Sequence, residues 1–432
     1  MVFGNPETTK GGSLPAREGF SKIIRMKYDC LVVGAGFSGA TVAERLASAG
    51  KKVLVIDRRL HIAGNAYDEH DPESHILIHA YGPHYFRTNS EKVRAYLSRF
   101  TEWMPVEYKI LSFTEDRYWQ FPINLNTFEQ ILGRPSTSEE MEETLQRWKV
   151  PIENPRNSEE VIISQVGVDL YERFFKNYTL KQWKRHPRDL DPSVCGRIPI
   201  RTNRDDRYLT ERFQALPVGG YTVLIRKMLS HPNIQVLLNA DFRGVRDAIP
   251  CRHTVYTGSI DEYFDCRFGP LPYRSLRFER QTYDTEFFQP AMQVNYPNDH
   301  EFTRIVEIKH ATGQKSPVTT IVKEYPEDFG PGKEPYYPIP APDTKALYGR
   351  YAELAATEGK VTFLGRLATY RYWNMDQVVA SALNAADEII PHRADPAPLP
   401  PLEQDPLFRL GELGKSADGA SAADHDRFLY GS

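Results

Sequence analysis

Gly34, Gly36 and Gly39 have the types and the spacing that a nucleotide-binding turn requires. They directly follow a short apolar run, residues 28–33. In such a turn the first glycine permits the bend, the second lets the backbone approach a pyrophosphate, and the third lets the next helix pack closely on the sheet. Asp57 ends the next apolar run, where a carboxylate can bond ribose hydroxyls and disfavours a 2′-phosphate. The pattern predicts a dinucleotide site for a cofactor other than NADP.

A second glycine-containing turn, far downstream, bears on which dinucleotide binds. Gly365 and Arg366 follow a strand-like run, and Asp376 leads into an apolar helix over residues 377–390. A flavin needs more anchoring than a nicotinamide cofactor, and the N-terminus of that helix could face flavin oxygen atoms. The spacing favours FAD over NAD, with an ordinary turn and a surface arginine as the alternative.

Arginines in the proline-containing segment after Trp183 have the chemistry of a phosphate clamp. They are Arg197, Arg201, Arg204 and Arg207. A charge-assisted hydrogen bond from a guanidinium group to a diphosphate contributes about 1.5–3 kcal/mol. Loop arginines are more often plain solvated charges, so the sequence leaves open whether any of the four binds phosphate.

Aromatic side chains gather in two places. Phe175, Tyr178 and Trp183 fit helical spacing, which predicts core packing, with stacking on a base as the alternative. Tyr336 and Tyr337 lie between two prolines, and we expect two exposed phenols that hydrogen-bond a polar ligand.

The sequence shows few signs of a metal site or of a nucleophilic side chain. His79 and His84 flank a Tyr-Gly-Pro turn, but no third ligand follows at a suitable spacing. The four cysteines include no Cys-x-x-Cys pair, and no Ser-His-Asp pattern or paired carboxylate stands out. We expect no metal, and we expect the cofactor to carry the chemistry.

The elements that must position the glycines are short strands around a helix. Residues 28–33 and 52–57 are β-branched apolar runs, and the alanine-rich segment between them has a helical packing face. This order predicts a β-α-β unit. A further strand over residues 360–364 and the helix over residues 377–390 close the fold.

The middle of the chain shows two other patterns of apolar residues. From about residue 90 to 178 the pattern predicts helices, with candidate capping boxes at Ser136-x-x-Glu139 and Asn157-x-x-Glu160. From about residue 273 to 322 alternating apolar residues predict antiparallel strands.

Composition excludes several classes of protein. The 432 residues carry 54 Lys and Arg against 57 Asp and Glu, a net charge of −3, which argues against general nucleic-acid binding. No run approaches the roughly 18 apolar residues of a membrane span, and the first residues do not resemble a signal peptide. We expect a soluble, cytoplasmic protein without membrane or nucleic-acid partners. Residues 1–26 and 393–432 are expected to be a flexible extension and a disordered tail.

Eight stretches, in order, resemble the UDP-galactopyranose mutase family, FAD enzymes that interconvert UDP-galactopyranose and UDP-galactofuranose. The resemblance covers about residues 26–390. The stretches are His61-Ile62-Ala63-Gly64-Asn65, Tyr81-Gly82-Pro83-His84, Tyr178-Thr179-Leu180-Lys181-Gln182-Trp183, Arg197-Ile198-Pro199, and residues 257–264, 271–276, 334–339 and 365–372.

The resemblance implies an α/β fold: a Rossmann-like FAD-binding domain with an inserted helical domain and an antiparallel β-sheet domain. The expected FAD-binding domain is discontinuous. The boundaries that we expect are residues 27–95, 205–270 and 355–392 for FAD binding, 96–204 for the helical domain with its mobile substrate loop, and 271–354 for the antiparallel sheet.

The resemblance also implies roles for individual residues. Arg197 and Arg304 clamp the diphosphate, and His84 and Arg366 lie close to the flavin; these four are the expected catalytic residues. Tyr178 stacks on uracil, and Trp183 lies on the mobile loop. The substrate-binding set is Phe175, Tyr178, Trp183, Tyr337, Tyr372, Asn374 and Arg87. The cofactor-binding set is Gly34, Gly36, Gly39, Asp57, Gly64, Asn65, Gly365 and Asp376.

The implied reaction is redox-neutral but requires reduced FAD. The flavin N5 atom displaces UDP from the anomeric carbon and forms a flavin–sugar adduct, in which the sugar ring opens and recloses. The protein then has to hold UDP still and exclude water, while acid and base side chains are secondary. The implied partners are UDP-galactose and UDP-galactofuranose, and family habit suggests a homodimer.

The chain departs from the family pattern at three positions. Arg87 stands where relatives acting on plain UDP-galactose usually have His, and relatives that also accept UDP-N-acetylgalactosamine carry Arg. The hypothesis is that Arg87 reaches the C2 substituent; a tolerated change at a loop rim is the alternative. Asn374 replaces the Asp of many relatives, and Ala63 replaces a common glycine.

Two other functions compete with this interpretation. A flavin oxidase of the amine-oxidase type shares the glycine pattern and predicts oxygen-dependent turnover. A non-catalytic binder resembling Rab GDP dissociation inhibitors predicts a colourless protein. The oxidase does not explain the arginine and tyrosine set, and the intact Asp57 and Gly365-Arg366 argue against the binder.

Overall fold

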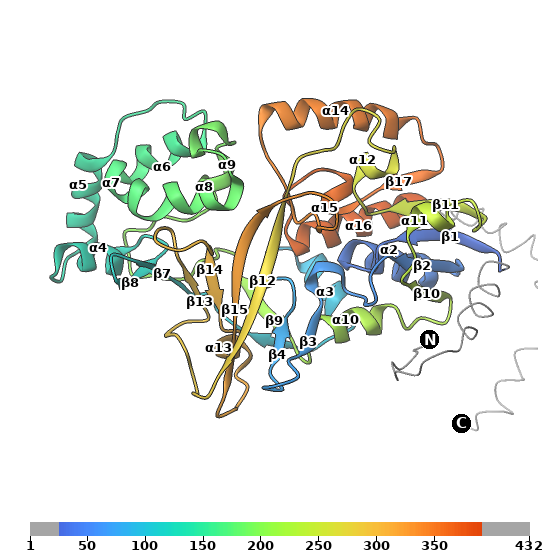
Figure 1. Ribbon diagram of the computed structural model, residues 1–432, viewed down its shortest axis with the longest axis horizontal. Coiled ribbons are helices and arrows are strands. Elements are labelled where there is room, and N and C mark those ends of the chain that lie inside the picture. Colours follow the sequence, from blue (N-terminus) through green and yellow to red (C-terminus); the bar gives the residue numbers. More distant parts are fainter. Residues whose placement is uncertain (1–25, 391–432) are drawn as a thin grey trace, which may run out of the picture. The chain divides into compact units, whose positions relative to one another are not determined.

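The computed structural model describes residues 26–390, so the expected tail over 393–432 and nearly all of the expected extension lie outside the described residues (Figure 1). The described residues up to Ala386 form one compact unit. The division into three domains therefore stays a proposal.

A parallel sheet carries the glycine pattern. Within the described residues it has the order β10-β2-β1-β11-β17, and all neighbours run parallel. Its strands are β1 (Tyr28–Val33), β2 (Val53–Asp57), β10 (Ile234–Leu238), β11 (Cys251–Tyr256) and β17 (Val361–Phe363). β1 and β2 consist mainly of β-branched and leucine residues, and their side chains are almost wholly buried, as a parallel sheet covered on both faces requires.

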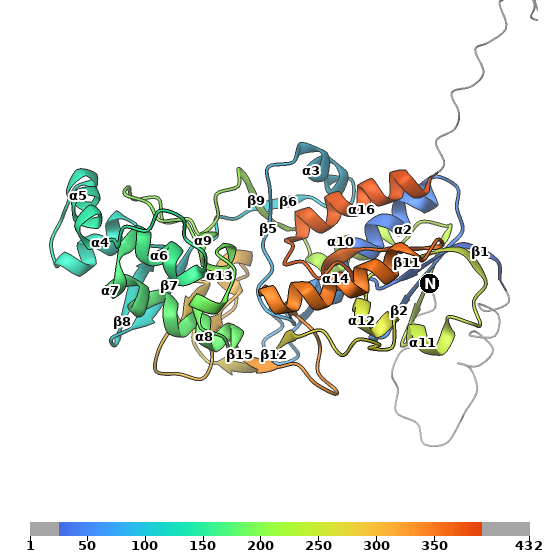
Figure 2. The same ribbon diagram turned by 90° about the horizontal axis from the view of Figure 1, so that it is seen from above.

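Helices pack on this sheet or connect its strands. Figures 1 and 2 show α2 and α16 side by side next to β1 and β2. The helices of this part are α2 (Phe37–Ser48), α3 (Glu91–Ser98), α10 (Tyr221–Met228), α11 (Phe242–Val245), α12 (Ile260–Tyr263), α14 (Pro342–Ala356), α15 (Gly365–Ala368) and α16 (Met375–Ile389). Leu31, Leu54 and Ile56 form a core cluster with Val245 and Ile249 under the short α11.

A second, mixed sheet contains the antiparallel strands predicted from residue 273 onward. Within the described residues its order is β16-β12-β15-β14-β13-β7-β8, with only β13 and β7 parallel. Its strands are β7 (Ile110–Thr114), β8 (Arg117–Phe121), β12 (Tyr273–Tyr283), β13 (Gln293–Asn295), β14 (Arg304–Val306), β15 (Thr319–Asp328) and β16 (Tyr337–Pro338), and α13 (Lys309–Thr312) lies between β14 and β15.

The expected helical segment from about residue 90 was partly wrong. After α3, the strands β6 (Trp103–Pro105), β7 and β8 come before any further helix, and β7 pairs with β13, which lies about 180 residues further along the chain. β6 joins a small sheet with β5 (Phe86–Thr88) and β9 (Phe213–Pro217), and β3 (Asp68–His70) pairs with β4 (Leu77–His79).

Short helices follow β8 and gather together in Figure 1. They are α4 (Leu125–Leu132), α5 (Ser138–Trp148), α6 (Ser158–Val166), α7 (Val168–Tyr171), α8 (Asn177–Trp183) and α9 (Ser193–Gly196). The predicted cap of α6 is confirmed, because Asn157 accepts from the Glu160 N–H at 2.9 Å. The cap of α5 was predicted one residue too early, since Thr137 rather than Ser136 accepts from the backbone, at Glu140.

No helix among residues 26–390 is long and apolar enough to cross a membrane. In the same part of the chain, no three His, Cys, Asp or Glu side chains come together as metal ligands would.

Candidate functional site

One elongated cavity runs along the carboxyl ends of β1 and β2. The lining residues include Asp57, Phe242 and Glu262 on the side of β2, and Arg366 and Met375 from α15 and α16. Its middle passes the N-terminus of α2, where free backbone N–H groups favour phosphate. A cavity with a binding region on each side of a phosphate-binding turn has the form that a dinucleotide needs.

The glycines of the turn are required by close backbone contacts. A side chain on Gly39 would lie 1.9 Å from the Gly34 carbonyl oxygen, and one on Gly34 would lie 2.1 Å from Thr257 Oγ1. Gly64 (φ +56°) lies directly against Gly36, because a side chain on Gly64 would lie 3.1 Å from the Gly36 Cα. The close helix packing predicted for Gly39 is confirmed, and Gly34, Gly36 and Gly64 all line the cavity.

Asp57 lies at the end of β2, as predicted, and is buried. Its Oδ2 accepts from the Ala35 N–H at 2.8 Å, and its Oδ1 accepts from the Arg59 N–H at 2.9 Å. Asp57 therefore fixes the glycine turn while lining the cavity. Arg59 donates to Asn65 Oδ1 at 2.8 Å, which ties the expected cofactor residue Asn65 to the same loop.

The far end of the cavity contains four of the expected residues. Gly365 (φ +87°) faces Ser38 on α2, and a side chain on Gly365 would lie 2.8 Å from Ser38 Oγ. Arg366 donates to the Trp373 carbonyl oxygen at 2.6 Å, which holds its guanidinium in place. Asn374 lines the cavity immediately before α16, and His84 enters from another loop.

Asp376, like Gly39 of the expected cofactor set, is not among the described residues that line the cavity. Its carboxyl is hydrogen-bonded to Thr88 and lies near Arg87 and Glu211; burial nevertheless raises its pKa. Because these partners lie around β5, the structure places Asp376 on the other side of the α16 N-terminus from the cavity residues.

A positively charged cluster adjoins the Arg366 end of the cavity. The Arg197 Cζ lies 4.5 Å and the Arg366 Cζ 5.2 Å from the ring centroid of Tyr372. Burial alone would raise the pKa of Tyr372, but Arg197, Arg366 and Arg304 outweigh burial and lower the pKa below its ordinary value of 10. A phenol that is easier to ionise when buried reports a strong positive potential, which would also stabilise a bound anion.

Arg304 is partly balanced by a carboxylate that sequence reasoning missed. Its Nη2 lies 2.7 Å from Oε2 of Glu324, which is 1% exposed and is the register partner of Arg304 between β14 and β15. The Arg304 Nε is buried and has no hydrogen-bond partner among the described residues. Glu324 could have been found as a charged residue in a strand position whose alternate neighbours, Thr320 and Val322, are buried.

Aromatic side chains enclose the cluster. Trp183 is buried and packs on Tyr337 and Tyr372, with ring centroids 6.1 and 5.9 Å apart. Tyr178 is close enough to Arg304 and Glu324 for both to affect its pKa, which burial raises. Phe175 instead packs in the helical core, 2% exposed, so core packing is the correct interpretation for this residue.

Tyr178 and Trp183 follow a π-helical turn, η2 (Glu172–Lys176), which shifts the helical register before α8. Such turns are frequent at functional sites. The expectation of two exposed phenols was wrong. Tyr336 is 4% exposed and packs on Tyr81, and Tyr337 is half-buried and packs on Tyr372 of the cluster.

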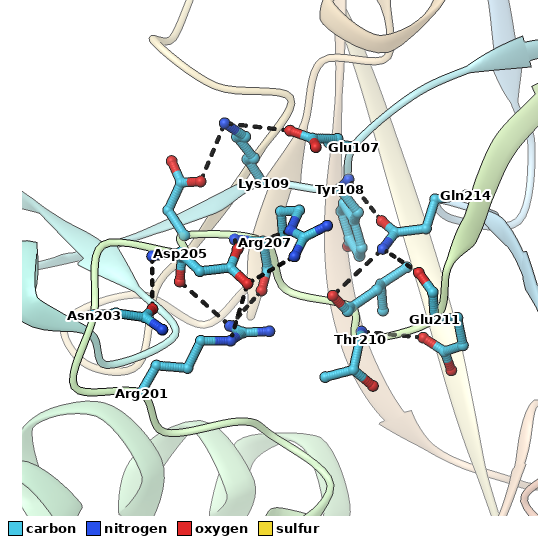
Figure 3. Close-up of polar contacts among 12 residues, drawn as sticks. Glu107, Tyr108, Lys109, Arg201, Asn203, Asp205, Arg207, Thr210, Glu211 and Gln214 are labelled. Atoms are coloured by element: carbon cyan, nitrogen blue, oxygen red, sulfur yellow. Dashed lines mark hydrogen bonds and ion pairs between the residues drawn. The ribbon is translucent and has the colours of Figure 1, made fainter.

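Of the four loop arginines, only Arg197 joins this cluster. Figure 3 shows Arg201 and Arg207 converging on Asp205, with a 2.8 Å bond from the Arg207 Nε to Asp205 Oδ1. Arg204 pairs with both carboxylate oxygens of Glu129. Arg201, Arg204 and Arg207 therefore pair with Asp205 or Glu129 and do not join the cluster around Tyr372.

Arg87 lies on β5 and pairs with Glu211 at 3.2 Å. Both Arg87 and Arg197 affect the pKa of Tyr208, which burial raises, so charges on β5 and in the arginine cluster both reach Tyr208. Sequence reasoning missed Tyr208, because nothing in its charged segment distinguishes it from a loop residue.

Comparisons with known proteins agree with the resemblance in the sequence. A family model for UDP-galactopyranose mutase matches residues 173–372, and one for an NAD(P)-binding Rossmann-like domain matches residues 32–100. A protein of Klebsiella pneumoniae named "Probable UDP-galactopyranose mutase" is 37% identical over 373 residues, 86% of this chain and 97% of the relative. The dTDP-fucopyranose mutase of Escherichia coli is 34% identical over 364 residues, 82% of this chain and 97% of the relative.

Solved structures share the fold at lower sequence identity. A crystal structure of reduced UDP-galactopyranose mutase aligns with a TM-score of 0.68 and 16% identity, over 84% of this chain and 96% of that chain. A structure of putrescine oxidase aligns with a TM-score of 0.51 and 13% identity, over 84% and 99%. The second alignment shows that an oxidase shares this architecture, so the fold alone does not distinguish the two activities.

Proposed function

The chain belongs to the UDP-galactopyranose mutase family, and we propose that it interconverts UDP-galactopyranose and UDP-galactofuranose with reduced FAD in the elongated cavity. The observation that carries the proposal is the placement of Arg197, Arg304 and Arg366 around Tyr372, beside the cavity. This arrangement suits a diphosphate leaving group, because guanidinium groups offset its charge without a proton transfer.

We assign the diphosphate to Arg197 and Arg304, with Tyr337 and Tyr372 as hydrogen-bond donors. The buried and unpartnered Arg304 Nε supplies one donor that is already desolvated. Tyr178 would stack on uracil, with Phe175 supporting the turn from within the helical core. Trp183 would cover the sugar and exclude water, because it already packs on both tyrosines.

The residues of the cavity fit FAD. Gly34, Gly36 and Gly64 provide a cradle without side chains, and Asp57, which lines the same cavity, would accept hydrogen bonds from a ribose. The Arg366 end has room at a helix N-terminus beside Asn374, which suits the flavin ring. When bound and reduced, FAD would supply the nucleophile, its N5 atom, that displaces UDP and holds the sugar while its ring opens and recloses.

Two observations bear on substrate range. The relative from Escherichia coli carries the name of a dTDP-sugar mutase, so the base and the sugar require direct measurement. We propose that UDP-N-acetylgalactosamine is a second substrate, whose C2 substituent Arg87 would contact. The proposal is supported by the effect of both Arg87 and Arg197 on the pKa of Tyr208, while Arg87 itself is held by Glu211. A homodimer is proposed on the resemblance alone.

The test begins with the visible spectrum of the purified protein, which we expect to be that of bound flavin. The protein is then assayed with UDP-galactofuranose before and after dithionite reduction. Isomerisation only after reduction supports the proposal. A colourless protein would favour the non-catalytic binder, and oxygen consumption with an amine would favour the oxidase.

A further inference from the structure

His84 reaches the cavity from a tight turn between β4 and β5. Gly82 in this turn has φ +84°, and a side chain on it would lie 3.1 Å from Glu324 Oε2 and 3.2 Å from Phe278. The turn therefore lies directly against β12 and β15. Its position sets where the imidazole of His84 enters the cavity.

Two buried side chains hold the backbone of His84 on both sides. The His84 N–H donates to Nδ1 of His79 at 3.0 Å, and the Tyr221 hydroxyl donates to the His84 carbonyl oxygen at 3.1 Å. His79 ends β4 and is 6% exposed, while Tyr221 begins α10 and is fully buried. The two rings meet edge to face, with centroids 5.5 Å apart. We name this pair the His79–Tyr221 clamp.

The hydrogen bonds define the protonation of both histidines. A carbonyl oxygen only accepts, so the His84 Nδ1, 2.9 Å from the Gly82 carbonyl oxygen, carries a proton. The His79 Nδ1 accepts from a backbone N–H, so it carries none, and its proton lies on Nε2. Burial lowers the pKa of His79 to about 4, and burial and His79 together lower the pKa of His84 to about 3, so both rings are neutral.

We infer that His79 and Tyr221 are positioning residues, which hold the His84 backbone so that a neutral imidazole faces the flavin end of the cavity. Neither residue is among the described residues that line the cavity, so both act through His84. The inference rests on the proposed FAD site.

The test compares variants of the flavin-loaded enzyme. His79→Leu removes the acceptor at similar size, His79→Asn places an amide oxygen near the position of Nδ1, and Tyr221→Phe removes one oxygen atom. We expect His79→Leu and Tyr221→Phe to shift the flavin absorption bands, to weaken FAD binding by about ten- to a hundredfold and to lower kcat. KM for UDP-galactofuranose should stay within about twofold, because the UDP residues are untouched. His79→Asn should keep all values within about threefold of the wild type.

Tyr96→Phe is the matched control, because the Tyr96 hydroxyl donates to buried Glu44 at 2.8 Å, in contact with α2. It should lower the unfolding temperature and leave the flavin spectrum and kcat unchanged. The inference is overturned if Tyr221→Phe has the wild-type spectrum and kcat, or if His79→Asn is as impaired as His79→Leu. Should His79→Leu not fold, Tyr221→Phe decides alone. A wild-type protein without flavin would refute the proposed function instead.

Discussion

The ion pair between Arg304 and Glu324 gives the sharpest test of the proposed diphosphate site, because mutations can separate the effect of Arg304 on stability from its effect on UDP binding. Glu324 is 1% exposed, and its Oε2 lies 2.7 Å from the Arg304 Nη2. Arg304→Met leaves this carboxylate buried without its partner, which typically costs about 3–5 kcal/mol of unfolding free energy. Adding Glu324→Gln removes the buried charge, so the double variant should regain most of that stability.

Binding of UDP should respond differently. If Arg304 contacts the diphosphate, Arg304→Met loses a charge-assisted interaction of about 1.5–3 kcal/mol, which weakens UDP binding by roughly ten- to 150-fold. The double variant should bind UDP as weakly as the single variant, because restoring stability does not restore the guanidinium. Glu324→Gln alone should bind UDP at least as tightly as the wild type.

Urea unfolding measures the stability, and titration calorimetry measures UDP affinity. Arg99→Met is the control, since Arg99 pairs with the buried Glu44 at 2.9 Å, away from the arginine cluster. It should lower stability and leave UDP affinity unchanged. The reasoning is refuted if Arg304→Met binds UDP like the wild type, or if the double variant recovers UDP affinity together with stability.

Three further predictions concern the cofactor turn, the specificity residue and the pH dependence. Gly39→Ala would place a methyl group 1.9 Å from the Gly34 carbonyl oxygen, so we expect loss of bound flavin and a lower urea midpoint; an unchanged ratio of flavin to protein contradicts this. Arg87→His should lower turnover of UDP-N-acetylgalactosamine relative to UDP-galactose by about tenfold, and an unchanged ratio of the two turnovers discards the hypothesis. The pKa of His79 is about 4 in the folded protein against 6.5 without burial, so its contribution to stability is complete above pH 6.5 and decreases as the pH falls toward 4. The unfolding free energy falls by about 1.4 kcal/mol for each pH unit in this range. Between pH 6.5 and 5, His79→Asn should therefore lose about 2 kcal/mol less unfolding free energy than the wild type; equal losses would show that His79 does not titrate in this way.

The β-α-β unit was predictable because its determinants are local. The predicted run 28–33 coincides with β1, and Gly39 is fixed by a contact with a residue only five positions away. Hydrophobic runs, a glycine turn and a terminal carboxylate each depend on neighbours in sequence. The strands β7 and β8 also pair locally, as a hairpin around Glu115 and Asp116, so their β-branched and aromatic residues were a local signal that the sequence reasoning missed. The pairing of β7 with β13 could not be found in this way, because it forms only when distant parts of the chain meet.

The sequence predicted which types of residue form the site, but only partly which individual residues come together there. Sequence could not separate Arg197 from Arg201, Arg204 and Arg207, since the difference lies in which carboxylates are near in space. Asp205 pairs with Arg201 and Arg207, and Glu129 pairs with Arg204. The resemblance to a family supplied Arg304. The strand pattern could point to Glu324 as a buried charge, but only the register between β14 and β15 shows that Glu324 is the partner of Arg304.

The sign of the charge separates two activities that the fold allows. An amine substrate is a cation, and it would have to approach three guanidinium groups with one buried carboxylate, Glu324, to offset them. Desolvated charges of like sign repel strongly, so such a site disfavours an amine. A nucleoside diphosphate sugar carries two negative charges, which balance the two positive charges left after Glu324 pairs with Arg304. In the proposed reaction this site would hold the diphosphate of the departing UDP, and the guanidinium groups, rather than a general acid, would stabilise UDP as the leaving group.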